Sequence, residues 1–123
     1  GILAVNPLPP VVWSYTDDVT RYDYDPEKAK ELLAEAGYPD GFKATIKLPA
    51  IYSYSRRAGE VIADMLRDVG IELDIEIVEW GQWIDRIFKK KEYQLTMIGH
   101  VEAWDIGIYA NPRLIDGGCE FID

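Results

Sequence analysis

The sequence predicts an α/β fold built on a mainly parallel sheet with flanking helices. Three segments alternate apolar and polar residues with the period of two that is typical of strands. Each of them follows a segment whose apolar residues recur at helical spacing. Because every connection between successive strands contains a helix, the strands are expected to run parallel. At 123 residues the chain has the length of one small domain with a single core.

Residues 1–24 show neither period and are expected to form an ordered lead-in segment. Proline fixes the backbone and removes a hydrogen-bond donor, so its prolines predict a segment that crosses a surface. Its aromatic rings are expected to pack on what lies beneath them. The prolines and aromatic residues concerned are Pro7, Pro9, Pro10, Trp13, Tyr15, Tyr22 and Tyr24.

The first helix is expected over 26–36 and the first strand over 42–48. Asp25 can cap the free amides of the helix, and Pro26 suits its first position. Gly37 provides a left-handed residue that ends the helix. One side of the helix is expected to be buried because it carries apolar residues at helical spacing: Ala29, Leu32, Leu33 and Ala36.

A second helix is expected over 58–69, a second strand over 71–77 and a third helix around 83–88. The second strand alternates apolar residues with acidic ones, which predicts a solvated acidic face. A short strand over 94–98 completes the series. Two tryptophans at the start of the third helix are expected in the core: Trp80 and Trp83.

The composition excludes several kinds of partner and cofactor. With 22 acidic and 13 basic residues the net charge is −9, so a nucleic-acid backbone would repel the chain. The single cysteine, Cys119, cannot form a disulfide within the chain, and one histidine cannot build a zinc cluster. We therefore expect no cofactor and no metal. No apolar run approaches the ~18 residues of a membrane span, so a soluble chain is expected.

The segment after the third strand is the first candidate for a ligand site, because ligands bind beyond the carboxyl ends of strands in open α/β sheets. Glu102 and Asp105 can bind a cation or an amine, or can instead pair with Arg113 or water. Trp104 can stack on a ligand or can pack in an interlobe or core position. His100 can contact a ligand, hold a metal or be a satisfied polar residue.

The segment after the first strand is the second candidate. Tyr54 is placed here with Arg56 and Arg57, either of which can bind a ligand carboxylate through two parallel hydrogen bonds. The alternative is that Ser53 or Ser55 caps the second helix and the arginines are solvated.

The stretch 22–42, YDYDPEKAKELLAEAGYPDGF, closely resembles the signature of the family 5 extracellular solute-binding proteins. These are the oligopeptide, dipeptide and nickel receptors of ABC importers. The resemblance continues through the junction Val69-Gly70-Ile71-Glu72-Leu73, through 83–98 and through the opening Pro7-Leu8-Pro9-Pro10. Nearly the whole chain is covered.

This resemblance implies a lobe of the periplasmic-binding-protein type II fold. Family members are several times longer and close two lobes around a ligand. Residues 1–123 are therefore expected to be a single C-terminal lobe whose N-terminal partner lobe is missing, with 1–24 as its lead-in. The chain opens without a leader, so we expect either that a leader has been removed or that the chain is an internal fragment.

The resemblance also implies the function and the location. The chain is expected to bind a peptide-like or small polar solute and to deliver it to ABC permease subunits, in the periplasm or outside the cell, where the transporter keeps it at the membrane. In peptide-binding members an acidic residue after the third strand holds the peptide amino terminus, and Asp105 is its positional match. Here 102–106 reads EAWDI where relatives have a Gly/Asp/Pro-rich stretch.

Two alternatives come from other functional classes. One is a ligand-sensing domain of a cytoplasmic regulator. The other is a small hydrolase that uses Glu102 and Asp105 as paired carboxylates. We expect a binding protein rather than an enzyme, because the sequence has no nucleophile motif and no phosphate-binding glycine loop.

Overall fold

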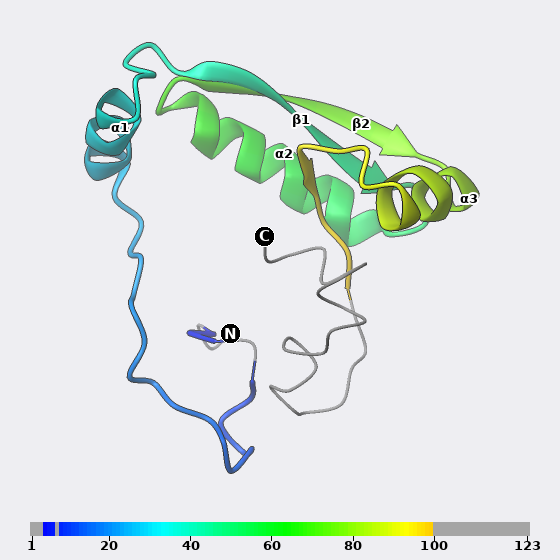
Figure 1. Cartoon of the computed structure of the whole chain (residues 1–123), viewed down its shortest axis with the longest axis horizontal. Coiled ribbons are helices and arrows are strands. Elements are labelled where there is room, and N and C mark those ends of the chain that lie inside the picture. The colour runs from blue at the N-terminus through cyan, green and yellow to red at the C-terminus, as the bar shows by residue number, and fades with distance from the viewer. Residues whose placement is uncertain (1–3, 7, 100–123) are drawn as a thin grey trace. The chain divides into compact units, whose positions relative to one another are not determined.

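The computed structural model describes residues 4–6 and 8–99. The chain divides into two compact units: Asp25–Gly99, and a second that combines Gly1–Tyr24 with His100–Asp123. The first unit contains all the helices and strands that the structure describes (Figure 1). No helix among these residues is both long and apolar enough to cross a membrane.

Residues 4–6 and 8–24 form turns and extended backbone rather than helices or strands. The side-chain amide of Asn6 donates to the carbonyl oxygen of Thr16, and its Oδ1 accepts from the backbone N–H of Leu8 at 2.8 Å. Leu8 is buried. Three aromatic residues of this segment are exposed, so the surface on which their rings are expected to pack is not supplied by the described residues: Trp13, Tyr22 and Tyr24.

Three parallel strands form the sheet in the order β2-β1-β3. They are β1 (Phe42–Pro49), β2 (Ile71–Val78) and β3 (Leu95–Thr96). β1 and β2 pair along their whole length, which confirms the predicted parallel sheet. β3 is shorter than the expected 94–98, and at its start the Gln94 side chain takes the place of a strand hydrogen bond. Its Oε1 accepts from the backbone N–H of Thr45 at 2.8 Å.

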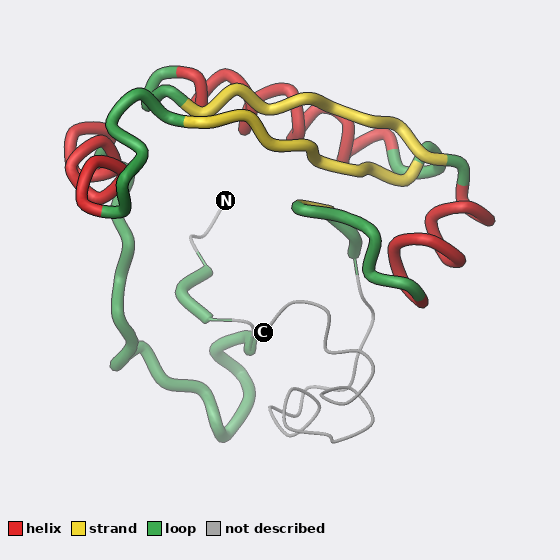
Figure 2. Tube along the Cα trace, turned by 45° about the horizontal axis from the view of Figure 1, so that its top comes forward, coloured by secondary structure: helices red, strands yellow, loops and turns green. Residues whose placement is uncertain are grey.

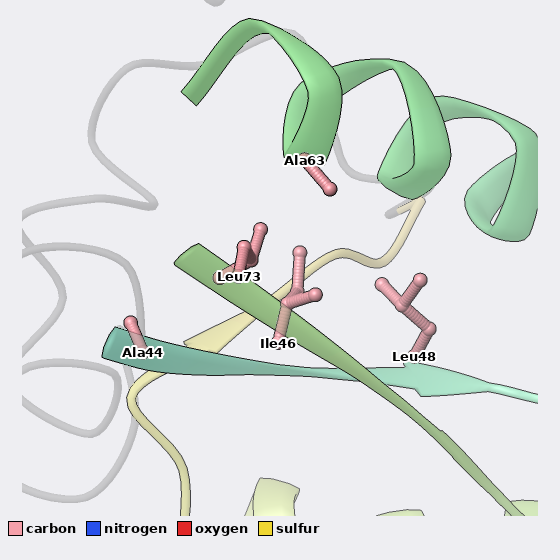
Figure 3. Close-up of a cluster of buried hydrophobic side chains, with 5 residues drawn as sticks. All are labelled: Ala44, Ile46, Leu48, Ala63 and Leu73. Carbon is pink, nitrogen blue, oxygen red and sulfur yellow. The ribbon is translucent and has the colours of Figure 1, made fainter. Parts of the chain in front are cut away.

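Helix α2 (Ser53–Arg67) covers one face of the sheet and runs along the β1–β2 pair (Figure 2). Its inner side meets the apolar side chains of both strands in one core (Figure 3). Gly59 allows this close approach, because a Cβ atom there would lie 2.6 Å from Cδ1 of Leu48. Full burial of an aliphatic side chain such as Leu48 stabilises a fold by roughly 1.5–3 kcal/mol. The core consists of Ala44, Ile46, Leu48, Ala63 and Leu73.

Helix α1 spans Pro26–Glu35 and begins as predicted. Asp25 caps it, since its Oδ1 accepts from the backbone N–H of Lys28 at 3.0 Å. The expected buried side is wrong: no residue of α1 is buried, and Leu32 is 52% exposed. The helix lies beyond the amino-terminal ends of β1 and β2 (Figure 1), so the sheet does not cover its apolar side.

Two glycines meet at the amino end of the sheet, just before β1 and β2. A Cβ atom on Gly41 would lie 1.8 Å from the carbonyl oxygen of Gly70, so a side chain at this position would collide with backbone. Their φ angles are +75° and +93°, a region that favours glycine. This contact fixes where the two strands start beside each other.

The face of the sheet opposite α2 carries charged pairs. Nζ of Lys43 lies 2.8 Å from Oε2 of Glu72, and Nζ of Lys47 lies 3.9 Å from Oε2 of Glu76. The hydrogen bond and the charge of Glu72 raise the pKa of Lys43. The acidic residues of β2 are exposed, which confirms the predicted solvated face of that strand.

The third helix consists of two parts, α3 (Trp80–Gln82) and the π-helix η1 (Trp83–Lys89). Trp83 is in the core as predicted, whereas Trp80 is only half-buried. Nε1 of Trp83 donates to Oγ1 of Thr96 at 3.1 Å and so ties η1 to β3. The second cluster of buried residues consists of Val78, Trp83 and Ile87.

Candidate functional site

A cavity of about 380 Å³ opens at the carboxyl end of β1, where the chain turns into α2. This is the strand-end position at which ligands bind in open α/β sheets. Its wall combines the aromatic ring of Tyr52 with the side chains of Arg56 and Arg57. The remaining wall residues come from the ends of β1 and β2 and the first turns of α2: Pro49, Ala50, Ser53, Glu60 and Ile77.

The two arginines in the wall have different surroundings. Nε of Arg56 lies 3.4 Å from Oε1 of Glu60, in an exposed pair one helical turn apart. Arg57 forms no ion pair or hydrogen bond with another residue in the described part of the chain. Its guanidinium therefore offers a planar set of donors, which matches the two oxygens of a carboxylate.

The amino terminus of α2 is also suited to an anionic group. The residue before the helix, Tyr52, provides no side-chain cap. The hydroxyl of Ser55 donates instead to the carbonyl oxygen of Tyr52 at 2.7 Å, so neither serine is the cap that the alternative expected. Both arginines are exposed, as that alternative expected. Uncapped first-turn amides and the helix dipole favour negative charge at this end.

Four aromatic residues, which we call the aromatic column, follow one another along the carboxyl edge of the sheet: Tyr54, Tyr52, Trp80 and Trp83. The ring centroids of Tyr54 and Tyr52 are 5.3 Å apart, and those of Tyr52 and Trp80 are 5.9 Å apart at 82°. Trp80 stacks on Trp83 at 5.3 Å and 7°. The column therefore connects the loop after β1 with the segment after β2.

Tyr54 also reaches the end of the third strand. A Cβ atom on Gly99 would lie 2.9 Å from the hydroxyl oxygen of Tyr54. The chain that leaves β3 thus passes directly beside this side chain. The loops that follow β1, β2 and β3 all contribute to one edge, as the parallel topology requires.

Two of the predicted ligand residues, Tyr54 and Arg56, lie together in the first turn of α2. The other predicted ligand residues lie outside the described residues: His100, Glu102, Trp104 and Asp105. The contact between Tyr52 and Trp80 is absent from the sequence-based expectations. The sequence does contain a signal for this contact, because Tyr52 and Trp80 each follow the carboxyl end of one of two neighbouring strands.

The carboxylates with shifted pKa values lie at η1 rather than in the cavity wall. The hydrogen bond and charge of Lys90 lower the pKa of Asp85. A hydrogen bond from Arg86 lowers the pKa of Glu92.

Among the described residues, no group of three acidic, histidine or cysteine side chains is placed to hold a metal ion. The chemistry that the cavity supports is recognition of an anionic group.

Several proteins share extended sequence similarity with this chain. The dipeptide-binding protein of Escherichia coli is 42% identical over 103 residues, which are 80% of this chain and 19% of that protein. Heme-binding protein A of Haemophilus influenzae is 41% identical over 100 residues, which are 78% of this chain and 18% of that protein. The chain thus spans about a fifth of the length of these relatives.

A solved structure agrees with these sequence matches. It is an ABC transporter-associated periplasmic binding protein of Helicobacter pylori in complex with the peptide STSA. Its TM-score is 0.71 at 36% identity, covering 80% of this chain and 19% of that chain. The match confirms the predicted α/β fold of the periplasmic-binding-protein type II class.

A family model described as bacterial extracellular solute-binding proteins, family 5 Middle, matches residues 1–109. The chain belongs to this family of bacterial extracellular solute-binding proteins.

Proposed function

We propose that this chain is a ligand-binding lobe of a receptor that delivers a peptide-like or small polar solute to an ABC importer. The cavity at the carboxyl end of β1 carries the proposal, because Arg57 has no ion pair there with another described residue. In this proposal the ligand carboxylate binds Arg57, and Arg56 adds positive charge beside it. The names of the relatives support a peptide-like ligand.

We also propose ligand contacts in the segment after the third strand. Asp105 is proposed to hold a ligand amine, because the resemblance matches it to the acidic residue that binds the amino terminus in peptide-binding members. Glu102, Trp104 and His100 are proposed as further ligand contacts of that segment.

The receptor is proposed to have two lobes, with residues 1–123 as the C-terminal one and the N-terminal lobe of the same protein as its partner. Apolar side chains on α1 and α2 support this, because Leu32, Val61 and Met65 are about half exposed. The receptor is proposed to work in the periplasm or outside the cell and to dock on the permease subunits of its importer, with no role for nucleic acid.

Binding without catalysis fits the relatives, which are binding proteins by name. The hydrolase alternative requires turnover that disappears in Asp105→Ala or Glu102→Ala. The regulator alternative requires a DNA-binding segment elsewhere in the same protein. No described residue favours either alternative.

Calorimetry of the full-length receptor with the dipeptide Ala-Ala tests the proposal. We expect binding, and we expect the C-terminal amide of the same dipeptide to bind about 10- to 100-fold more weakly, because hydrogen bonds to charged groups contribute roughly 1.5–3 kcal/mol. Acetylation of the amino terminus tests the role of Asp105 in the same way. The proposal fails if none of the dipeptides Ala-Ala, Ala-Phe and Ala-Arg binds, and the carboxylate site fails if the amide binds equally well.

A further inference from the structure

Tyr54 ends the aromatic column with a ring that remains open to solvent. Trp83, at the other end, is 2% exposed, and Tyr52 and Trp80 are half-buried. Trp80 already has the ring of Trp83 stacked on it and the ring of Tyr52 at its edge. Tyr54 is 48% exposed and contacts one ring of the column, that of Tyr52. Among the four residues of the column Tyr54 is the most exposed and can accept one more ring, whereas at the other end Phe88 already lies 6.2 Å from Trp83.

The column is also held in place before any ligand arrives. The indole N–H of Trp83 donates to Thr96 at 3.1 Å, and the Thr96 hydroxyl donates to the carbonyl oxygen of Lys47 at 2.7 Å. At the other end, the Ser55 hydroxyl donates to the carbonyl oxygen of Tyr52. A contact made by a fixed side chain avoids much of the ordering entropy that binding otherwise costs. These bonds fix the ring of Trp83 and the backbone at Tyr52, the residue against which the ring of Tyr54 packs.

The neighbouring charges decide which planar group fits. Tyr52 contacts Tyr54 and also lines the cavity with Arg56 and Arg57. Glu60 pairs with Arg56, so the charge of Arg57 remains uncompensated among the described residues. A guanidinium or another planar cation on Tyr54 would be repelled by that charge. An uncharged aromatic ring keeps the stacking contact without this repulsion.

We propose that Tyr54 is a stacking platform for an uncharged aromatic side chain of the ligand, whose carboxylate lies on Arg57. This inference rests on the proposed function and narrows its ligand class to peptides with an aromatic C-terminal residue. In such a residue the aromatic side chain and the carboxylate are attached to the same Cα atom. This matches the placement of Tyr54 and Arg57 in the same turn of α2.

Calorimetry of the full-length receptor with Ala-Phe, Ala-Ala and Ala-Arg tests this inference. We expect Ala-Phe to bind about tenfold more tightly than Ala-Ala, since ring stacking adds to the burial of apolar area. Ala-Arg is expected to bind more weakly than Ala-Phe. Tyr54→Ala should reduce the ratio of Ala-Phe to Ala-Ala affinity about tenfold, whereas Tyr54→Phe, which keeps the ring, should preserve it.

Tyr38 provides the matched control. It is 51% exposed and contacts Phe42 at the opposite, amino end of the sheet. Tyr38→Ala is therefore expected to leave the Ala-Phe preference unchanged. Equal affinities for Ala-Phe and Ala-Ala would overturn the inference and leave the proposed function intact. Loss of the preference in Tyr54→Phe, or tighter binding of Ala-Arg, would also overturn it. Failure of all three peptides to bind would overturn both.

Discussion

Arg56 and Arg57 are sequence neighbours that are expected to contribute differently to binding. A ligand carboxylate has to compete with Glu60 for Arg56, whose Nε lies 3.4 Å from that carboxylate. Arg57 needs no such exchange with another described residue. We expect Arg57→Gln to weaken Ala-Ala binding by about 10- to 100-fold, and Arg56→Gln to weaken it less. Calorimetry on the full-length receptor measures both.

Arg67 is the matched control for this comparison. It lies in the last turn of α2, where its Nη1 is 2.7 Å from Oδ1 of Asp64. Arg67→Gln removes the same charge from the same helix without touching the cavity wall. We expect no change in affinity beyond the small long-range effect of the lost charge, which salt screens. If Arg67→Gln weakens binding as much as Arg57→Gln, overall charge rather than a specific contact explains the effect.

The residues of the candidate site were predictable only in part. Tyr54 and Arg56 follow from the rule that sites lie beyond strand ends, because the period of two shows where the first strand stops. The column from Tyr52 to Trp80 depends on contact between two strand ends that are distant in sequence. Their spacing is set by the register of β1 on β2, which no local pattern encodes. The roles of His100 and Asp105 stay predictions, since they lie outside the described residues.

At the scale of the elements, the junction before β1 and β2 depends on contact between two glycines. Gly41→Ala would place a Cβ atom 1.8 Å from the carbonyl oxygen of Gly70, and no side-chain rotation relieves a clash with backbone. We expect it to lower the free energy of unfolding by at least about 2 kcal/mol. Urea unfolding of this chain, followed by far-ultraviolet circular dichroism, measures the change.

Gly37→Ala separates this clash from backbone strain. Gly37 also has a positive φ, +90°, but nothing lies within 4 Å of the position of its Cβ atom. The alanine should therefore cost only about 1 kcal/mol, which is the strain of the left-handed region. Equal losses in the two variants would show that the contact between Gly41 and Gly70 is not tight in solution.

The elements also show which physical information a sequence pattern contains. The periods of β1, α2 and β2 are correct because each buries one side against another of the three. The period of α1 indicates an apolar side but not what covers it, and here that side is exposed. β3 starts later than its pattern suggests because the Gln94 side chain competes with the backbone for Thr45. A hydrophobic period predicts a helix or a strand and its apolar side, whereas the segments that bury this side depend on the rest of the fold.

At the scale of the whole molecule, one face of the sheet has a helical cover and the other carries charged pairs. Several apolar side chains remain exposed outside the core: Leu32, Val61, Met65 and Leu95. In the two-lobe proposal, the second lobe and the rest of the receptor would cover such side chains.

The isolated 123-residue chain is expected to bind Ala-Ala at least about 100-fold more weakly than the full-length receptor. In the two-lobe proposal it would lack the contacts of the second lobe and the closure that excludes water, so about half the contacts would have to offset the ligand's loss of freedom. Titration followed by amide chemical shifts measures this affinity and shows in the same spectra that the chain is folded. Residual shifts are expected around Arg57. An affinity equal to that of the full-length receptor in a folded chain would contradict the two-lobe proposal.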